Sequence, residues 1–271
     1  MSDDIDSNHY IDPNHIIDIK TVQSSAIKVL VESLKEILTD CNLIIDDTGI
    51  KIIAMDSTHT VLIHMKLEAD KFESYYCKER IVVGINVLNL YKLIKTMSNL
   101  DTLTFFIHND SVNHLGILIN NHQKNTQTIY NLNLLDIPEE TINIPPVEFE
   151  TELSLPSSDF QKIIKDMGSI GVNTEIKSVG SKLIFKCDGD FASQTTILGE
   201  TQNGLKFNQN KVDESHIVQG IFSLKYLVLF TKCTNLCNQI QLYIKNDYPL
   251  IIKYSIASLG MIKLCLAPNT N

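Results

Sequence analysis

The sequence lacks any apolar run that approaches the roughly 20 residues needed to cross a lipid bilayer. It also lacks a signal or transit peptide, because its opening residues, MSDDIDSNHYIDPNH, are polar and acidic. Six cysteines form no paired framework, and the only close pair, Cys233 and Cys237, does not have the spacing of a zinc knuckle or a redox pair. These absences predict an intracellular, soluble chain with free thiols.

Catalytic motifs are missing as well. No Gly-x4-Gly-Lys loop is present, so we expect no ATP hydrolysis. Asp56, Ser57 and His59 lie close together and suggest a hydrolase, but consecutive strand residues point to opposite faces and no Gly-x-Ser-x-Gly elbow supports a nucleophile. Helical ligand pairing is absent among the histidines that we considered, which are His59, His64, His108 and His114. The sequence therefore predicts no enzyme, no cofactor and no metal site.

The composition leaves room for a folded core. The chain has 271 residues, 44% of them hydrophobic, which suffices for one or two domains. Its formal net charge is −9 and its pI about 5.3, so the totals alone do not indicate nucleic-acid binding.

Four segments have the apolar periodicity of a helix. They span about residues 24–38, 87–97, 157–167 and 224–233, and Ser157 or Ser158 is a candidate N-cap of the third. Between them lie short β-rich runs bounded by turn residues, such as IKIIAMD, TVLIHMKL, TLTFFIH and KLIFKCD. The sequence thus predicts an α+β fold dominated by antiparallel strands.

The order of these elements repeats. Each half reads strand, helix, several strands, helix, several strands, which indicates a tandem duplication. The helices align when Leu34 is paired with Ile164 and Leu90 with Leu227, which also pairs Lys35 with Lys165 and Lys95 with Lys232. We expect an acidic, disordered tail at residues 1–18, a first domain at 19–135, an exposed connector (DIPEETINIPPV) at 136–147 and a second domain at 148–271.

All four helices carry lysines away from their apolar stripes: Lys28, Lys35, Lys92, Lys95, Lys162, Lys165, Lys225 and Lys232. A solvated face explains the lysines of any single helix. In an acidic protein, however, four such helices on one side would segregate the charge, with one basic face and an acidic remainder. That distribution suits a polyanion that approaches from one direction.

Several segments together resemble the DNA polymerase sliding clamps of the proliferating cell nuclear antigen type. They follow one another between Lys20 and Pro268 and read VQSSAIKVLVESLKEIL, GIKIIAMDSTHTVLIHMKL, LYKLIKTM, LPSSDFQKIIKDM, LKYLVLFTKCT and CLAP. The resemblance implies two similar domains per chain and a closed homotrimeric ring, with twelve helices around duplex DNA and the sheets outside. The eight helix lysines and Lys20 would then lie near phosphates without reading sequence.

The resemblance also implies an outer groove for partner peptides, with the matching positions Met55, His59, Leu62, Ile142, Ile144, Pro249, Cys265, Ala267 and Pro268. Expected partners are DNA polymerase, clamp loader, flap endonuclease and ligase type proteins, which would dock through short peptide motifs. Cys265 stands where the family commonly has an aromatic residue, and Pro138, Thr141 and Asn143 change the connector. Partner preference is therefore expected to differ.

The resemblance further implies that subunits join through the strand around Thr126–Leu134 and the strand around Phe191–Leu198 of the next chain, with Thr128, Tyr130, Thr195 and Ile197 in the interface. The expected location is the nucleus, or the replication site of a host cell if the chain is viral. Three alternatives stay open at this point: a checkpoint-type hetero-clamp subunit, a monomeric processivity factor, and a protein-binding adaptor without DNA binding.

Overall fold

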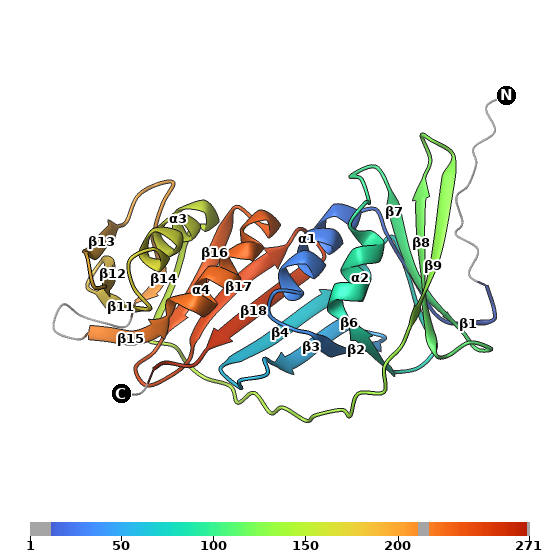
Figure 1. Ribbon diagram of the computed structural model, residues 1–271, viewed down its shortest axis with the longest axis horizontal. Coiled ribbons are helices and arrows are strands. Elements are labelled where there is room, and N and C mark those ends of the chain that lie inside the picture. The colour runs from blue at the N-terminus through green and yellow to red at the C-terminus, as the bar shows by residue number, and fades with distance from the viewer. Residues whose placement is uncertain (1–11, 211–216, 270–271) are drawn as a thin grey trace.

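The computed structural model describes residues 12–210 and 217–269, which form two tandem domains with the same element order (Figure 1). The first domain consists of β1 (His15–Thr21), α1 (Ser24–Leu34), β2 (Asp40–Asp46), β3 (Gly49–Met55), β4 (Val61–Glu68), the short 3-10 helix η1 (Ala69–Lys71), β5 (Ser74–Cys77), β6 (Ile81–Asn86), α2 (Val87–Ile94), β7 (Thr102–His108), β8 (His114–Asn121) and β9 (Thr126–Asn133). The second consists of β10 (Thr151–Pro156), α3 (Ser157–Gly168), β11 (Asn173–Val179), β12 (Lys182–Asp188), β13 (Ser193–Gly199), β14 (Lys206–Asn210), β15 (Ile217–Ser223), α4 (Leu224–Phe230), the 3-10 helix η2 (Thr231–Leu236), β16 (Gln239–Ile244), β17 (Leu250–Ile256) and β18 (Gly260–Leu266).

The first strand begins earlier than the sequence predicted. Residues 1–11 of the expected tail lie outside the described residues, but β1 starts at His15. Ile17 and Ile19 are fully buried in the core of the first domain. The boundary expected between residues 18 and 19 therefore falls inside a core strand.

The internal repeat is real in its element order, but one predicted alignment is wrong by about one helical turn. Helices α1 and α3 begin at Ser24 and Ser157, and both of these serines are buried. Counting from these starts pairs Leu34 with Met167 instead of with Ile164. Lys165 consequently corresponds to Glu32, so the lysines of these two helices are not equivalent. The alignment of α2 with α4 agrees with their starts at Val87 and Leu224.

Three helices end earlier than their apolar periodicity suggested. After Leu34 the amides of Glu36 and Ile37 bond three residues back, to the carbonyls of Ser33 and Leu34, so the last turn of α1 tightens and the helix stops short of Leu38. Helix α2 likewise ends at Ile94, and α4 ends at Phe230 and continues as η2.

The predicted N-cap of the third helix is also wrong. Pro156 occupies the cap position, and Ser157 is the first helical residue. Its hydroxyl instead donates a hydrogen bond of 2.6 Å to the carbonyl oxygen of Cys237, which ties α3 to the segment after η2.

The strands form three sheets with a repeated order. The first domain contains β5-β1-β7-β8-β9 and β4-β3-β2-β6, and the second contains β14-β10-β16-β17-β18 and β13-β12-β11-β15. Antiparallel pairing of β18 with β4, from Gly260 opposite Leu67 to Leu266 opposite Val61, merges two of these into one nine-stranded sheet. Strands β9 and β13 remain as outer edges at opposite ends of the molecule (Figure 1).

The helices lie together on one side of the nine-stranded sheet (Figure 1). Helix α1 contacts α2 and η2, and α3 contacts α4 and η2, so the helices of both domains form a continuous row. Their buried faces, such as Phe160, Ile164 and Met167 of α3, pack into the core, which leaves the opposite faces to solvent. Within residues 12–210 and 217–269, none of the helices has the length and apolarity to span a lipid bilayer.

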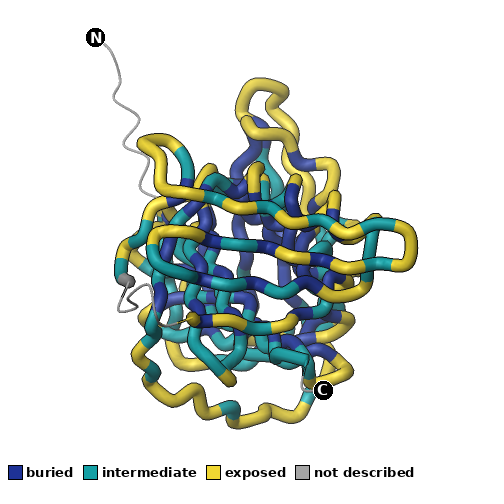
Figure 2. The backbone as a smooth tube through the Cα atoms, turned by 90° about the vertical axis from the view of Figure 1, so that its left-hand side faces the viewer, coloured by how far each residue is buried: buried dark blue, intermediate teal, exposed yellow. Residues whose placement is uncertain are grey.

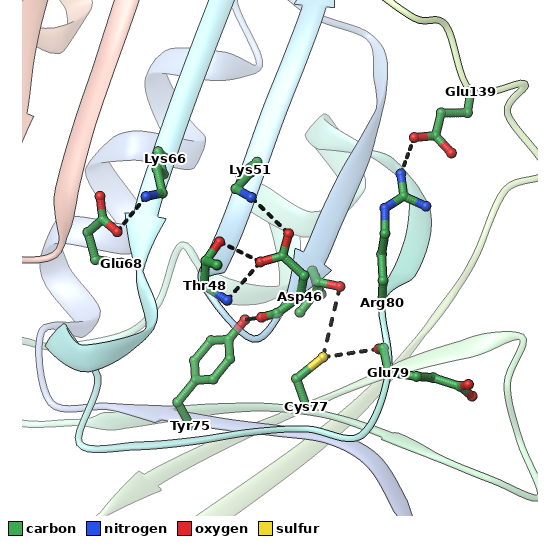
Figure 3. A network of polar contacts seen from close by, with 11 residues as sticks. Asp46, Thr48, Lys51, Lys66, Glu68, Tyr75, Cys77, Glu79, Arg80 and Glu139 are labelled. Atoms are coloured by element: carbon green, nitrogen blue, oxygen red, sulfur yellow. Dashed lines mark hydrogen bonds and ion pairs between the residues drawn. The ribbon is translucent and has the colours of Figure 1, made fainter.

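The connector between the domains runs along the outside of the molecule and is mostly exposed (Figure 2). It leaves the first domain at Leu135, whose amide donates to the carbonyl oxygen of Gly84 at 2.8 Å. A side chain at Gly84 would clash with the carbonyl of Leu135, so this close approach requires glycine. Farther along, the ion pair between Arg80 and Glu139 holds the connector to the first domain (Figure 3).

Candidate nucleic-acid interface and partner groove

Six of the predicted lysines are exposed on the outer faces of the helix row: Lys92, Lys95, Lys162, Lys165, Lys225 and Lys232. Each lies on α2, α3, α4 or η2 or directly after one of them, opposite a buried apolar stripe. No ion pair to another described residue engages any of the six ammonium groups. The row therefore presents free positive charge to solvent on its α2, α3 and α4 parts.

The remaining three predicted lysines are differently placed. The ammonium of Lys28 donates to the carbonyl oxygen of Met97 at 2.7 Å and so ties α1 to the segment after α2. Lys35 forms an ion pair with Glu36, and the hydrogen bond between them raises the pKa of Lys35 and lowers that of Glu36. Lys20 lies in strand β1, opposite Ser74 and Thr104, instead of on a helix.

Helix α1 consequently offers less free positive charge than its lysines suggest, because both of their ammonium groups have partners. The ammonium of Lys35 also lies 4.9 Å from the ring centre of Tyr91, whose hydroxyl donates to the carboxylate of Glu32 at 3.0 Å. Two acids and a phenol thus surround one lysine at the junction of α1 and α2. We conclude that the basic surface is carried chiefly by α2, α4 and η2, whereas the two lysines of α3 lie beside the exposed Asp159 and Asp166.

Three of the predicted groove residues form one row across three strands. In the β3–β4 ladder Met55 lies opposite Leu62, and in the β4–β18 ladder Leu62 lies opposite Cys265. All three side chains are half-buried. Burial raises the pKa of the Cys265 thiol to about 11, so the thiol is uncharged at neutral pH and contributes an apolar surface.

The turn between β3 and β4 is shaped by a buried carboxylate. Desolvation alone would raise the pKa of Asp56, but hydrogen bonds outweigh it and lower the pKa. The hydroxyl of Thr58 makes the largest lowering contribution, and the backbone amides of Thr60 and Val61 donate at 2.8 and 2.7 Å. His59 completes this turn with a φ of 55° and an exposed side chain. Asp56 therefore builds the turn, which argues against the hydrolase interpretation.

The C-terminal groove residues lie beside this turn. The amide of Ala267 donates to the carbonyl oxygen of Thr60 at 3.1 Å, and Pro268 and Pro249 are half-buried. In the connector, Ile142 is half-buried and Ile144 exposes 40% of its surface. The structure thus unites Met55, Leu62, Cys265 and Ala267, whereas the connector isoleucines lie on a separate exposed segment.

A hollow of about 570 Å³ adjoins Pro268 and was missed by the sequence reasoning. Its apolar walls come from Ile217 and Ile221 of β15 and from Tyr248 before β17. Ile217 and Ile221 expose 45% and 36% of their surfaces although they lie on a strand. Ile217, Gln219 and Ile221 share the outward face of β15, so the sequence could suggest an apolar outer face there but not the hollow, which also needs Tyr248 and Pro268.

The predicted interface residues lie on the two outer edge strands. Thr128 and Tyr130 belong to β9, and Thr195 and Ile197 belong to β13. Ile197 exposes 58% of its surface, and the neighbouring Ile129 of β9 exposes 56%. Exposed apolar side chains on unpaired edges are unusual for a monomer, because such edges pair readily with other chains.

Comparisons with known proteins agree with this architecture. The family model described as "Proliferating cell nuclear antigen, N-terminal domain" matches residues 16–141, and the one described as "Proliferating cell nuclear antigen, C-terminal domain" matches residues 143–269. The chain belongs to the proliferating cell nuclear antigen family. The fold predicted from the sequence, two tandem clamp domains of antiparallel sheets with four helices, is confirmed in the described residues.

Individual members of the proliferating cell nuclear antigen family match over nearly their full length. A probable DNA polymerase sliding clamp 1 of Paramecium bursaria Chlorella virus 1 is 36% identical over 261 residues, which cover 95% of this chain and 98% of that protein. The proliferating cell nuclear antigen of Chaetomium thermophilum is 30% identical over 254 residues, which cover 93% of this chain and 98% of that protein.

Proposed function

We propose that this chain is a DNA sliding clamp, a non-enzymatic processivity factor that encircles duplex DNA as a homotrimer and tethers replication and repair proteins to it. The observation that carries the proposal is the joint between the two domains. Inside the chain, β18 of the second domain pairs with β4 of the first. Their counterparts in the repeat, β9 and β13, are edge strands at opposite ends of the molecule, and each has one open side.

The internal joint supplies a template for the joint between subunits. When the ladders of the two domains are superimposed strand by strand, Tyr130 occupies the position of Leu264, and Gln194 occupies the position of Ile63. Leu264 and Ile63 are directly opposite each other in the β18–β4 ladder. We therefore expect Tyr130 to lie opposite Gln194 of the partner subunit.

A contact of this kind joins different surfaces of successive chains, so it produces either a closed ring or an open filament. Two structurally equivalent joints, one within and one between chains, favour a ring because each repeats the same rotation between neighbouring domains. The number of three subunits is taken from the family. Closure would pair both edges, which otherwise expose Ile129 and Ile197.

The helix row would face the enclosed DNA. Duplex DNA carries about one charge per 1.7 Å of its axis, so the six exposed lysines can contact phosphates at any register. The basic side chains of the row are all lysines, and Arg80, the single arginine of the chain, pairs with Glu139 on the connector. An ammonium contacts phosphate with less directional preference than a guanidinium, and such loose contacts suit a protein that slides.

Partner peptides would dock on the outer surface. The row formed by Met55, Leu62 and Cys265 offers an apolar floor, and the hollow beside Pro268 offers a deeper socket for an anchor residue. DNA polymerase, clamp loader, flap endonuclease and ligase type proteins are the expected partners. The expected location is the replication site, in a nucleus or in an infected cell.

Two cysteine variants test the ring. Tyr130→Cys combined with Gln194→Cys should form disulfide-linked oligomers on oxidation, because directly opposite strand residues lie within the Cα separation that a disulfide spans. Tyr130→Cys combined with Thr196→Cys is the control, since its second thiol is displaced by two residues on the same strand. Equal cross-linking of both pairs, or of neither, would contradict the proposed register.

Topological retention tests the clamp itself. Once loaded onto nicked circular DNA, the protein should resist salt washes and should dissociate when the circle is cut. Light scattering should show a stable homotrimer. A stable monomer would instead support the hetero-clamp or monomeric alternative, and equal behaviour on circular and linear DNA would support the adaptor.

A further inference from the structure

A cluster of metal-binding side chains lies where the chain enters β1, at the right-hand end of the molecule in Figure 1. Asp12, His15 and His108 each bring one potential ligand atom within 4.8 Å of the other two. In the part of the chain that the structure describes, no other three His, Cys, Asp or Glu side chains lie this close together. The cluster is separate from the helix lysines and from the groove residues.

A bulge in β1 orients the first histidine. The register between β1 and β7 shifts between His15 and Ile17. In a regular strand, residues three apart point to opposite faces, but a bulge reverses the alternation and brings His15 and Asp18 to the same face. The Nδ1 atom of His15 lies 2.8 Å from the Oδ2 atom of Asp18, and Asp18 exposes only 3% of its surface.

The contact with Asp18 fixes the chemistry of His15. A carboxylate accepts a hydrogen bond but cannot donate one, so Nδ1 of His15 carries the proton. In the neutral imidazole the other ring nitrogen, Nε2, keeps its lone pair and can bind a metal ion. A hydrogen bond from the second ring nitrogen to a carboxylate is one of the contacts that orient metal-bound histidines in proteins.

An aromatic ring holds the two imidazoles in place. Phe106 stacks on His15, with ring centres 5.2 Å apart and planes inclined by 24°, and meets His108 edge to face at 5.1 Å. The Phe106 ring itself lies over Gly116 of β8, where a Cβ would come within 2.3 Å of it. The glycine therefore makes room for the ring that supports the cluster.

Backbone bonds fix the third ligand. The Oδ1 atom of Asp12 accepts from the amide of Asn14 at 2.9 Å, and the amide of His15 donates to the carbonyl oxygen of Asp12 at 2.9 Å. The carbonyl oxygen of Asn14 in turn accepts from the amide of Asn109 at 2.8 Å, next to His108. The entry to β1 and the end of β7 are thus already fastened to each other around the cluster.

We propose that Asp12, His15 and His108 bind a divalent transition-metal ion of the zinc class, which fastens the start of β1 to the end of β7. Two imidazoles, one carboxylate and a water molecule complete a tetrahedral coordination shell. Zinc–nitrogen distances of about 2.0–2.1 Å place the ligands of one ion roughly 3.4 Å apart, so small side-chain rotations close the site from its present spacing. Imidazole and carboxylate ligands suit zinc better than calcium or magnesium, which prefer oxygen alone.

The sequence concealed this cluster. His15 and His108 are far apart in the chain and show no helical spacing, and only the pairing of β1 with β7 makes them neighbours. Asp18 lies three residues after His15, a spacing that does not suggest contact in a strand without knowledge of the bulge. The expectation of no metal site rested on histidines taken one at a time.

Calorimetric titration of the full-length, untagged protein with zinc chloride tests the proposal. Wild type should bind one ion per chain. His108→Gln and Asp12→Asn should each weaken binding at least tenfold, and Asp18→Asn should weaken it about 10–100-fold because the orienting contact is removed. His122→Gln, an equal change at an exposed histidine between β8 and β9, is the matched control and should bind like wild type.

Thermal melting supplies a second readout. Zinc should raise the melting temperature of wild type and His122→Gln, a chelator should reverse this, and His108→Gln should not respond, because only a ligand that binds the folded state stabilises it. The proposal is overturned if wild type takes up no zinc saturably, or if His108→Gln and His122→Gln bind it equally well. In the latter case the ion would reside elsewhere on the protein.

Discussion

The hydroxyl of Ser33 in α1 donates a hydrogen bond of 3.1 Å to the carbonyl oxygen of Lys232 in η2. The same hydroxyl lies 2.8 Å from the carbonyl oxygen of Val29 within its own helix. A buried side chain of the first domain thus fixes the backbone that carries a lysine of the second. Helix α1 and η2 are consequently joined directly across the boundary between the two domains.

We expect removal of these lysines to weaken DNA retention in steps. Lys92→Ala with Lys95→Ala should have a modest effect, because DNA cannot touch every side of a ring at once. Adding Lys162→Ala and Lys165→Ala should weaken retention much more. The slope of the logarithm of the binding constant against the logarithm of salt concentration should become less steep by about one unit for each phosphate that the protein no longer neutralises. Polymerase processivity on primed circular DNA, measured against salt concentration, checks this.

The matched control removes charge from elsewhere. Lys182→Ala with Lys206→Ala, at exposed positions of β12 and β14, should leave retention unchanged. All these variants should melt within a few degrees of wild type, since exposed substitutions alter stability by about 0.5 kcal/mol or less. A quadruple variant that melts normally and keeps full processivity at elevated salt would show that the lysines are only a solvated face.

Subunit assembly should depend on Tyr130. Its ring is half-buried on the edge strand β9, and Tyr130→Ala removes the largest side chain of the proposed joint. Light scattering over a dilution series should show a shift from trimer toward monomer. Tyr76→Ala changes a half-buried tyrosine on β5, at the other edge of the same sheet, and should assemble normally. A Tyr130→Ala variant that stays trimeric at high dilution would place the interface elsewhere.

By the family resemblance the connector borders the partner groove, so peptide binding should depend on its isoleucines as well as on the row of Met55, Leu62 and Cys265. A peptide of the Gln-x-x-aliphatic-x-x-aromatic-aromatic type should bind wild type, and Ile142→Asp with Ile144→Asp should abolish binding. An unpaired carboxylate placed against an apolar anchor costs several kcal/mol, which exceeds what a weak peptide complex can tolerate. Thr141→Asp with Asn143→Asp adds the same charge at neighbouring exposed positions and should bind nearly normally. Equal peptide affinity of both double variants in calorimetry would mean that the partner site does not include the connector isoleucines.

Acid stability should depend on Asp46, at the turn between β2 and β3 (Figure 3). Desolvation by itself would raise the pKa of Asp46, but hydrogen bonds from Lys51 and Thr48 lower it to about 2. Because an unfolded aspartate has a pKa of about 3.9, this carboxylate stabilises the fold above pH 4 and loses that effect as the pH falls toward 2.

Urea unfolding between pH 6 and pH 2 measures this effect. Asp46→Asn should unfold more easily than wild type at neutral pH, and the difference between the two free energies of unfolding should shrink below pH 4. Asp47→Asn, at the adjacent exposed residue, should follow wild type throughout. A difference between Asp46→Asn and wild type that is independent of pH would mean that the carboxylate charge is not what stabilises this turn.

Apolar periodicity predicted the existence of the helices and strands because it is a local property. It did not predict where helices end, since Ile37 and Leu38 continue the apolar stripe of α1 into a turn and still pack against the protein. Lysine position was predicted correctly for α2, α3 and α4. For α1 the prediction was incomplete, because the partners of Lys28 and Lys35 include a backbone carbonyl and a ring from beyond that helix.

Cross-strand relationships were beyond the reach of the sequence. The row of Met55, Leu62 and Cys265 depends on ladder registers between segments far apart in the chain. The family resemblance supplied these residues as a group, but their arrangement required the sheet. His15 and His108 had no such resemblance to reveal them.

The pairing of β18 with β4 also constrains the order in which the protein can mature. During synthesis β4 emerges long before β18, so the first domain must wait with an open, hydrogen-bonding edge while the whole second domain is made. Lys66 and Glu68 near the end of β4, joined as an ion pair, put charge on that waiting edge, a feature that discourages premature pairing between nascent chains. The nine-stranded sheet can therefore form only after β18 has been synthesised through Leu266. Assembly with other subunits would follow that step.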